Sequence, residues 1–300
     1  RFWIGPEGGP FSIYFKKGKE QIYENWRVPA CIDTEEFTLK EKRDNSLKFR
    51  KEASLVNASG TKFNILIERT VSILSAQQIS LAFNIEISDA LSFVGYQTDN
   101  KIMNTGSSAW SKESGLLSIW MLGMFNPTPA TTVFIPYNTS VEGAVVNDDY
   151  FGKVPADRLK VEDGFIYFKI DGTYRSKIGV SQERATGICG SYDSQKKVLT
   201  ILWCSVPSEK QAYVNSKWGE QENPYEGDVI NSYNDGPTED GTVMGPFYEI
   251  ETSSPAVGLL QGQSMQHIQR VVHFSGKEDE LAAIAQKIFN VKLSTITSKF

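Results

Sequence analysis

Short runs in which apolar and polar residues alternate recur along most of the chain. In residues 165–170 the even positions are apolar and the odd positions are mixed, as in a strand with one buried face. Such runs are rich in Val, Ile, Phe, Tyr and Thr and are bounded by Gly, Asn, Asp and Pro. They predict strands at 11–15, 62–68, 79–87, 117–124, 131–136, 164–170, 198–206, 244–251 and 264–274.

One segment near the end of the chain predicts a helix. Ser275 and Glu278 have the spacing of a capping box, and apolar residues follow at helical spacing from Leu281 to Ile288. No internal repeat or low-complexity linker divides the chain. The pattern suggests roughly fifteen to twenty strands, which favours one β-sandwich domain over residues 1–300.

Composition narrows the classes of partner. The 300 residues are 40% hydrophobic, and the net charge of -5 comes from mixed acids and bases without a basic block. We therefore do not expect nucleic acid as a partner. No run of eighteen apolar residues occurs, so no transmembrane segment is predicted. The start at Arg1 fits a trimmed form or a mature chain whose leader has been removed.

The three cysteines, Cys31, Cys189 and Cys204, are too widely spaced for a dense disulfide framework or a C-x-x-C metal site. A bridge between Cys189 and Cys204 stays open as an alternative to buried thiols. The only histidines, His267 and His273, share a predicted strand at a separation of roughly 20 Å, which prevents them from binding one metal ion. We predict packing or surface roles for both histidines, and no metal or cofactor.

Proton transfer without histidine would require carboxylates, Tyr, Lys or water. Glu249 and Glu251 are the leading candidates, because side chains two apart in a strand lie on the same face. In a cleft, their mutual repulsion would raise one pKa and create an acid and a base. The alternative is that both glutamates solvate an exposed face.

Two more polar runs precede these glutamates. Asn231, Tyr233 and Asp235 alternate onto one side, where they could bind the hydroxyl groups of a sugar, although residues 234–237 also have the composition of a turn. Residues 146–153 contain adjacent acids that suit either Ca²⁺ or a solvated loop. Four tryptophans have polar or turn neighbours and are candidates for stacking on a sugar or for the core: Trp26, Trp110, Trp120 and Trp218.

Both ends of the chain resemble the aldose 1-epimerase, or galactose mutarotase-like, superfamily. The opening R-F-W-I-G-P-E-G-G-P-F-S is similar to the segment that starts the family's sandwich. The stretch from Tyr248 to Pro255, then Leu260 to His267 and Val271 to Phe274, is similar to its ending. The resemblance implies an all-β supersandwich, with a short C-terminal helix in this chain, and places Glu251 at the family's catalytic base, with Glu249 as the fallback.

The resemblance also has a gap. The family's catalytic acid is a histidine, and the corresponding stretches here, 104–110 and 119–127, contain none. The whole chain further resembles a group of proteins from gut Bacteroidota, which brings no activity but implies an exported protein, periplasmic or lipid-anchored, working among glycan-processing enzymes.

We therefore expect a carbohydrate-binding protein of mutarotase-like fold that lacks the usual Glu and His pair. The alternative is a sugar epimerase, mutarotase or other carbohydrate-active enzyme that uses Glu251 as base. The ligand would be a mono- or oligosaccharide, and the oligomeric state is left open. Beside Glu249, Asp235, Tyr233 and Asn231, the expected binding residues are Arg69 or Lys153 for a sugar acid and Trp110 or Trp120 for stacking.

Overall fold

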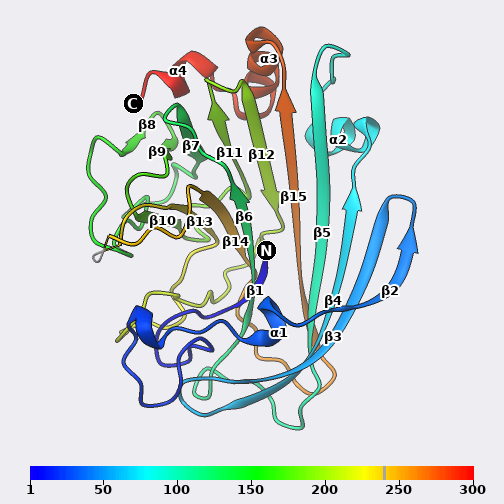
Figure 1. The fold of residues 1–300 in the computed structure, drawn as a ribbon, viewed down its shortest axis with the longest axis vertical. Coiled ribbons are helices and arrows are strands. Elements are labelled where there is room, and N and C mark those ends of the chain that lie inside the picture. The colour runs from blue at the N-terminus through cyan, green and yellow to red at the C-terminus, as the bar shows by residue number, and fades with distance from the viewer. Residues whose placement is uncertain (239–240) are drawn as a thin grey trace.

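The computed structural model describes residues 1–238 and 241–300, whose strands form two antiparallel sheets (Figure 1). In spatial order, the smaller sheet contains β1 (Phe2–Gly5), β6 (Ser118–Phe125), β14 (Tyr248–Ser253), β13 (Ile230–Asn234) and β10 (Ser176–Val180). The larger sheet contains β2 (Thr38–Arg43), β3 (Ser46–Val56), β4 (Lys62–Ile73), β5 (Ser92–Asn104), β15 (Ser264–Ser275), β12 (Val198–Cys204), β11 (Ile188–Asp193), β7 (Thr131–Pro136), β9 (Phe165–Lys169) and β8 (Leu159–Glu162). The predicted all-β fold with a short C-terminal helix is confirmed.

The larger sheet is buried on both faces over part of its width. On one face, Val133 and Ile135 of β7 belong to the same core as Ile178 and Ile250 of the smaller sheet. On the other face, Phe134 packs in a second core that includes residues of the helices α3 (Glu278–Phe289), α4 (Leu293–Thr297) and α2 (Ala76–Phe83). This double burial explains why successive residues of β7 are buried, instead of every second one.

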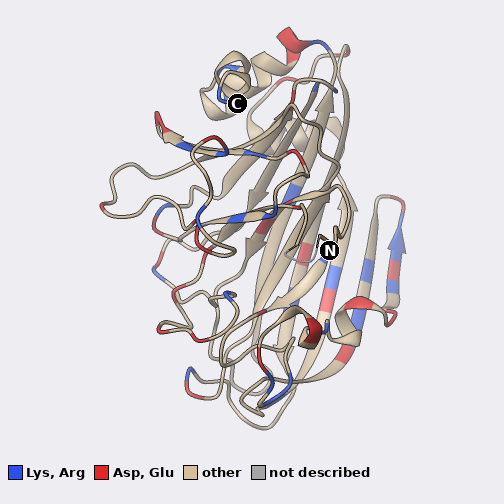
Figure 2. Cartoon of the chain, turned by 60° about the vertical axis from the view of Figure 1, so that its left-hand side comes forward, with Lys and Arg blue, Asp and Glu red and all other residues tan. Residues whose placement is uncertain are grey.

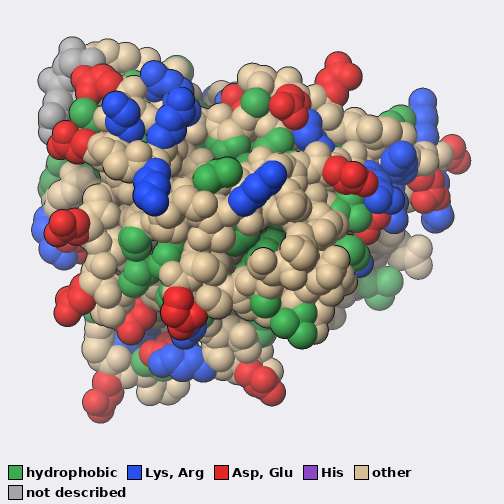
Figure 3. All heavy atoms as spheres, turned by 90° about the horizontal axis from the view of Figure 1, so that it is seen from below, with side chains coloured by type: hydrophobic (Ala, Val, Ile, Leu, Met, Phe, Trp, Pro, Cys, Tyr) green, Lys and Arg blue, Asp and Glu red, His purple; other side chains and the backbone are tan. Residues whose placement is uncertain are grey.

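The edge strand β2 of the larger sheet carries basic and acidic residues in turn, as Figure 2 shows. Every residue of β2 is exposed, and Arg43 pairs with Glu41 in the same strand. On the next two strands, Lys48 and Glu68 form an ion pair at 3.8 Å. Charges on an edge strand discourage pairing with the edge of another sheet. Basic and acidic side chains are also interspersed over the lower face of the molecule (Figure 3).

Two of the predicted strands are wrong. Residues 11–15 form turns, because the backbone N–H groups of Ser12 and Ile13 bond back to Gly9 and Pro6 instead of to a neighbouring strand. The segment 79–87 falls largely within α2, which begins after a capping box between Ser75 and Gln78. Only Ile79 of this helix is buried, so its helical period is weak in the sequence.

The boundaries of two other elements also differ from the prediction. The strand expected from residue 244 begins only at Tyr248, after the turn-forming residues Gly245 and Pro246. The C-terminal helix is present as α3, but its N-cap is Lys277 and Ser275 makes no capping hydrogen bond, because Ser275 still belongs to β15. A short helix α1 (Ala30–Asp33) and a 3₁₀ turn (Tyr23–Asn25) complete the elements.

Cys31, Cys189 and Cys204 are free and buried, as the thiol alternative predicts. Burial in the apolar core raises the pKa of Cys189 well above its ordinary value and that of Cys204 to about 12. Both thiols therefore stay protonated and pack as small apolar groups. No helix of the described residues combines the length and apolar character needed to cross a membrane.

The double burial of β7 predicts a large stability difference between two apolar truncations. Phe134 is fully buried and its ring contacts that of Phe289 at 4.9 Å between centroids. Phe134→Ala should lower the free energy of unfolding by about 3–5 kcal/mol, because it leaves a cavity. Leu81 is 77% exposed, so Leu81→Ala should change the free energy of unfolding by less than about 0.5 kcal/mol. Urea unfolding measures both, and similar losses would contradict the described packing.

Candidate functional site

The two glutamates of β14 lie on the face of the smaller sheet that is opposite its core. Tyr248 and Ile250 pack between the sheets, so the alternation of the strand places Glu249 and Glu251 on the other side. Both glutamates are nevertheless buried, with Glu251 only 1% exposed, because loops cover this face. The exposed alternative for the pair is therefore wrong. The pleat of one strand brings two carboxylates together in a protected space.

The register of the sheet continues this polar face across its neighbours. Glu249 lies opposite Tyr233 of β13, and Tyr233 lies opposite Lys177 of β10. On the other side of β14, Trp120 of β6 lies opposite Trp3 of β1. Side chains from five strands thus form the floor of one pocket.

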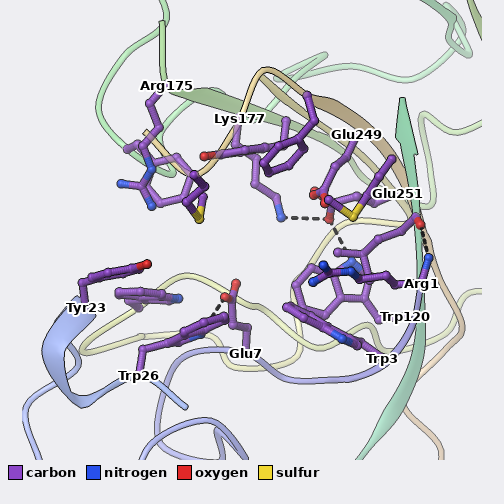
Figure 4. Close-up of a pocket in the computed structure, with 17 residues that line it drawn as sticks. Arg1, Trp3, Glu7, Tyr23, Trp26, Trp120, Arg175, Lys177, Glu249 and Glu251 are labelled. Carbon is purple, nitrogen blue, oxygen red and sulfur yellow. Dashed lines mark hydrogen bonds and ion pairs between the residues drawn. The ribbon is translucent and has the colours of Figure 1, made fainter. Parts of the chain in front are cut away.

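Loops supply the walls of this pocket, which has a cavity volume of about 130 Å³ and is partly open to solvent (Figure 4). The lining residues are Arg1, Trp3, Glu7, Tyr23, Trp26, Trp120, Leu122, Met124, Phe151, Arg175, Lys177, Trp218, Tyr233, Met244, Phe247, Glu249 and Glu251.

An ion pair lies at the centre of the pocket. The Nζ of Lys177 and the Nε1 of Trp120 both donate to Oε2 of Glu251, each at 2.8 Å (Figure 4). Burial by itself lowers the pKa of Lys177, but attraction to Glu251 and Glu7 raises it above its ordinary value. Lys177 is therefore charged, and its ammonium group pairs with Glu251 at 2.8 Å.

Glu249 has the opposite protonation state. Burial and repulsion from Glu251 raise the pKa of Glu249 well above its ordinary value. The environment therefore favours the neutral form of Glu249, while Glu251 pairs with Lys177. This pattern, in which environment separates the pKa values of two neighbouring acids, is the arrangement that gives an acid and a base.

Aromatic rings form the wall that faces these acids. Tyr23 stacks on Trp26 at 6.2 Å between centroids, and Trp26 stacks on Trp218 at 6.4 Å. The Nε1 of Trp26 donates to Oε1 of Glu7 at 3.0 Å, which directs this third carboxyl group into the pocket. Burial raises the pKa of Glu7, and attraction to Lys177 opposes the change.

Several polar atoms of the pocket lack partners. Among the described residues, seven buried side-chain N or O atoms make no hydrogen bond, and four of them belong to residues that line this pocket. These four are Nε1 of Trp3, Nε of Arg175, Nε1 of Trp218 and Oε1 of Glu251. Buried polar groups are normally paired, so their concentration here indicates a place for a polar ligand or ordered water.

A second polar cluster lies beside the pocket. Oδ2 of Asp228 accepts from the hydroxyl of Tyr150 at 2.6 Å and from Nδ2 of Asn147 at 3.2 Å. Asn231 joins this cluster by donating to the Tyr150 hydroxyl at 3.1 Å, while the Tyr150 ring lies 5.4 Å from Nζ of Lys177. The predicted binding residue Asn231 therefore supports Tyr150 and does not line the pocket.

The remaining predicted residues divide between the pocket and distant positions. Tyr233 lines the pocket with Trp120, Glu249 and Glu251, and its hydroxyl donates to the fully buried Asp235 at 2.9 Å. Asp235 itself does not line the pocket, and its hydrogen bond orients the Tyr233 side chain.

Arg69, Lys153 and Trp110 do not line the pocket. Arg69 donates to Asn100 at 2.9 Å, Lys153 pairs with Asp148 at the surface, and Trp110 packs on Phe63 in the core. Each of the three side chains contacts a partner outside the pocket, and the sequence pattern did not identify these contacts.

Both histidines lie outside the pocket, in the packing roles that the sequence favours. The Nε2 of His267 contacts Oγ1 of Thr252 at 2.8 Å, and burial lowers the pKa of His267 to about 4. His273 contacts the Thr200 hydroxyl at 2.9 Å. Within residues 1–238 and 241–300, no three His, Cys, Asp or Glu side chains are grouped to hold a metal ion.

Sequence reasoning missed Glu7, Arg175 and Lys177 as site residues. Lys177 could have been found, because a lone lysine in the run S-K-I-G-V interrupts an otherwise apolar strand. Glu7 carries no such signal, since it lies in a loop whose path depends on tertiary contacts.

The fold is that of the galactose mutarotase-like proteins. The chain is similar to a candidate aldose 1-epimerase of Escherichia coli K12, with TM-score 0.50, 11% identity and coverage of 89% of this chain and 82% of that one. It is also similar to the Slr1438 protein of Synechocystis sp. PCC 6803, with TM-score 0.51, 11% identity and coverage of 92% and 78%. At this identity the likeness shows the fold alone.

The chain belongs to the family of unknown function DUF6786, whose model matches residues 1–300. No curated protein matches the chain by sequence.

The raised pKa of Glu249 predicts how stability depends on pH. The folded protein keeps a proton on Glu249 that the unfolded chain releases above about pH 4.3. The contribution of this proton to stability is therefore complete below that pKa and is lost as pH rises through the folded pKa.

Between about pH 5 and about pH 8, the wild type should lose more stability than Glu249→Gln, which stays neutral in both states. Urea midpoints at both pH values measure the difference. The exposed Glu209→Gln serves as control and should follow the wild type. Parallel pH dependence of the wild type and Glu249→Gln would show that Glu249 is charged in the folded protein.

Proposed function

We propose that this protein binds a carbohydrate, a mono- or oligosaccharide, in the pocket above β14. The observation that carries the proposal is the combination of unpaired buried polar atoms with aromatic walls. Four of the seven unpaired buried polar atoms of the described residues belong to side chains of this one pocket. A sugar offers many hydroxyl groups that both donate and accept, and such groups would complete these hydrogen bonds.

The aromatic wall supports the same ligand class. Trp26 and Trp218 are half-buried, and Tyr23 is 52% exposed, so their rings are accessible at the pocket. Indole rings combine a large apolar face with a polar N–H, which suits the apolar face and the hydroxyl rim of a pyranose ring. The mutarotase-like fold adds an analogy, which by itself does not assign an activity.

A second candidate function is proton transfer on the bound sugar, and the protonation of Glu249 and Glu251 favours it. Anomer exchange requires one group that takes the proton of the anomeric hydroxyl and one that protonates the ring oxygen. Oε1 of Glu251 accepts from no N–H group among the described residues, and the raised pKa of Glu249, to which a hydrogen bond with Glu251 contributes, favours a proton beside it. The two carboxyl groups could divide these roles without histidine.

We also propose an exported location for this protein, either periplasmic or lipid-anchored.

Binding is tested by calorimetric titration with neutral hexoses, pentoses, uronic acids and short oligosaccharides. For any sugar that binds, Trp26→Leu should weaken the affinity by about two- to tenfold, because the stacking ring is lost. Trp203→Leu is the matched control, since Trp203 lies on β12 outside the pocket, beneath Arg270. If no sugar binds, or if both variants weaken binding equally, the pocket is not the carbohydrate site.

The catalytic candidate is tested on the sugar that binds, by following anomer exchange with NMR. An enzyme should exchange anomers faster than buffer, and Glu251→Gln and Glu249→Gln should each reduce the rate by about a hundredfold or more. A pure binding protein should leave the buffer rate unchanged while Glu251→Gln still weakens affinity. Glu209→Gln, whose side chain is exposed, should leave both readouts unchanged.

A further inference from the structure

Arg175 is one of two arginines that line the pocket, and neither it nor Arg1 forms an ion pair among the described residues. It precedes β10 by one residue and lies two positions before Lys177, so both side chains leave the same face of the sheet. In the view of Figure 4, Lys177 lies between Arg175 and Glu251. The guanidinium of Arg175 and the carboxylate of Glu251 therefore occupy different ends of the pocket.

The contacts of Arg175 hold its guanidinium without neutralising it. The guanidinium carbon lies 3.8 Å from the ring centroid of Phe151, a cation–π contact that occupies the flat face of the group. Its N–H groups lie in the plane. Burial raises the pKa of Tyr233, and the guanidinium, which is close enough to the Tyr233 hydroxyl to hydrogen-bond with it, opposes this rise. Nε is nevertheless buried without a hydrogen-bond partner among the described residues. Within residues 1–238 and 241–300, Arg175 forms no ion pair.

Another arginine of this protein, Arg158, shows how a guanidinium pairs with a carboxylate. Nη1 and Nη2 of Arg158 donate to the two carboxylate oxygens of Asp171 at 3.0 and 2.9 Å. This bidentate pair is the preferred geometry for arginine and a carboxylate or phosphate. Arg175 presents the same planar donors to the pocket, where the equivalent acceptor would belong to a ligand.

The charge balance of the pocket favours a negative ligand. The charge of Lys177 is matched by Glu251, with which it forms an ion pair at 2.8 Å. Glu249 retains its proton, because burial and repulsion from Glu251 raise its pKa. Arg1, Arg175 and Glu7 also line the pocket without an ion pair among the described residues, so two arginines face one remaining carboxyl group. A buried or half-buried charge is stable only when it is paired or solvated.

We propose that the sugar bound by this pocket carries an anionic group, a carboxylate or a phosphate, which Arg175 binds in a bidentate manner. The ring would lie against the aromatic wall, and a hydroxyl group would reach the Glu251 end. This inference rests on the proposed function and deepens it, because it names an acidic sugar as the ligand class. It also assigns to Arg175 the role that the sequence suggested for Arg69 or Lys153.

The test compares matched sugars by calorimetric titration at low salt. Glucuronate is compared with glucose, galacturonate with galactose, and glucose 6-phosphate with both acids, so that the carboxylate and phosphate sources are distinguished. Acetate, sulfate and inorganic phosphate are titrated alone, to detect an adventitious ion only. An acidic sugar should bind at least about tenfold more tightly than its neutral partner, since hydrogen bonds to charged groups are the stronger ones.

Two variants assign the difference to Arg175. Arg175→Gln should remove the preference for the acidic sugar, so that in this variant the acidic sugar and its neutral partner bind with similar affinity. Arg175→Lys keeps the charge without the planar donors, so it should retain part of the preference. Arg43→Gln, an exposed arginine on β2, is the control and should bind like the wild type. Ligand-free thermal melting verifies that each variant is folded.

The outcomes separate this inference from the proposed function. Equal affinity for acidic and neutral sugars, or an acidic preference that survives Arg175→Gln, overturns the inference but leaves carbohydrate binding intact. Inorganic anions that bind as tightly as the acidic sugars reveal an adventitious ion only and also overturn it. Failure of every sugar, neutral or acidic, to bind overturns both proposals.

Discussion

The ion pair between Lys177 and Glu251 is the interaction on which the rest of the pocket depends. The alternation of β14 places Glu249 and Glu251 under the same covering loops, and two carboxylates cannot both be charged there without compensation. Lys177, from the edge strand β10, pairs with Glu251, while burial and repulsion from Glu251 raise the pKa of Glu249. The compensation of charge at Glu251 therefore depends on the position of one lysine. That position is fixed by the register of β10 on β13.

The sequence predicted the architecture better than it predicted the site. Alternation in β9 and β14 identified strands correctly, and placed Glu249 and Glu251 together, because period-two patterning survives wherever one face of a strand is buried. It failed for α2, whose single buried residue, Ile79, leaves almost no helical period. It also could not distinguish Trp120, which lines the pocket, from Trp110, which packs in the core, because both have mixed neighbours in the sequence. That difference arises only from contacts between distant segments.

The structure shows which ionisable groups lie beside Glu251 in place of a histidine. A resemblance to mutarotases implies a Glu and His pair, yet His267 is buried at Thr252 and has a pKa lowered to about 4, which leaves it neutral. The sheet instead brings a lysine and a second carboxyl group to Glu251. The same scaffold thus carries a different set of ionisable groups at its pocket, which is a common relation between fold and function. Similarity of fold to solved structures at 11% identity therefore does not determine the chemistry of the pocket, which depends on these side chains.

The position of β15 in the larger sheet has a consequence for synthesis of the chain. β15 lies between β5 and β12 and pairs with both over most of its length, although Gln266 is 167 residues from its partner Asp99. While the ribosome is still making residues before 264, β5 and β12 each present an unpaired edge, and the larger sheet exists as two separate halves. Because non-local strand pairing is slow and open edges invite aggregation, the nascent protein depends on the late synthesis of β15 to join the two halves of its larger sheet.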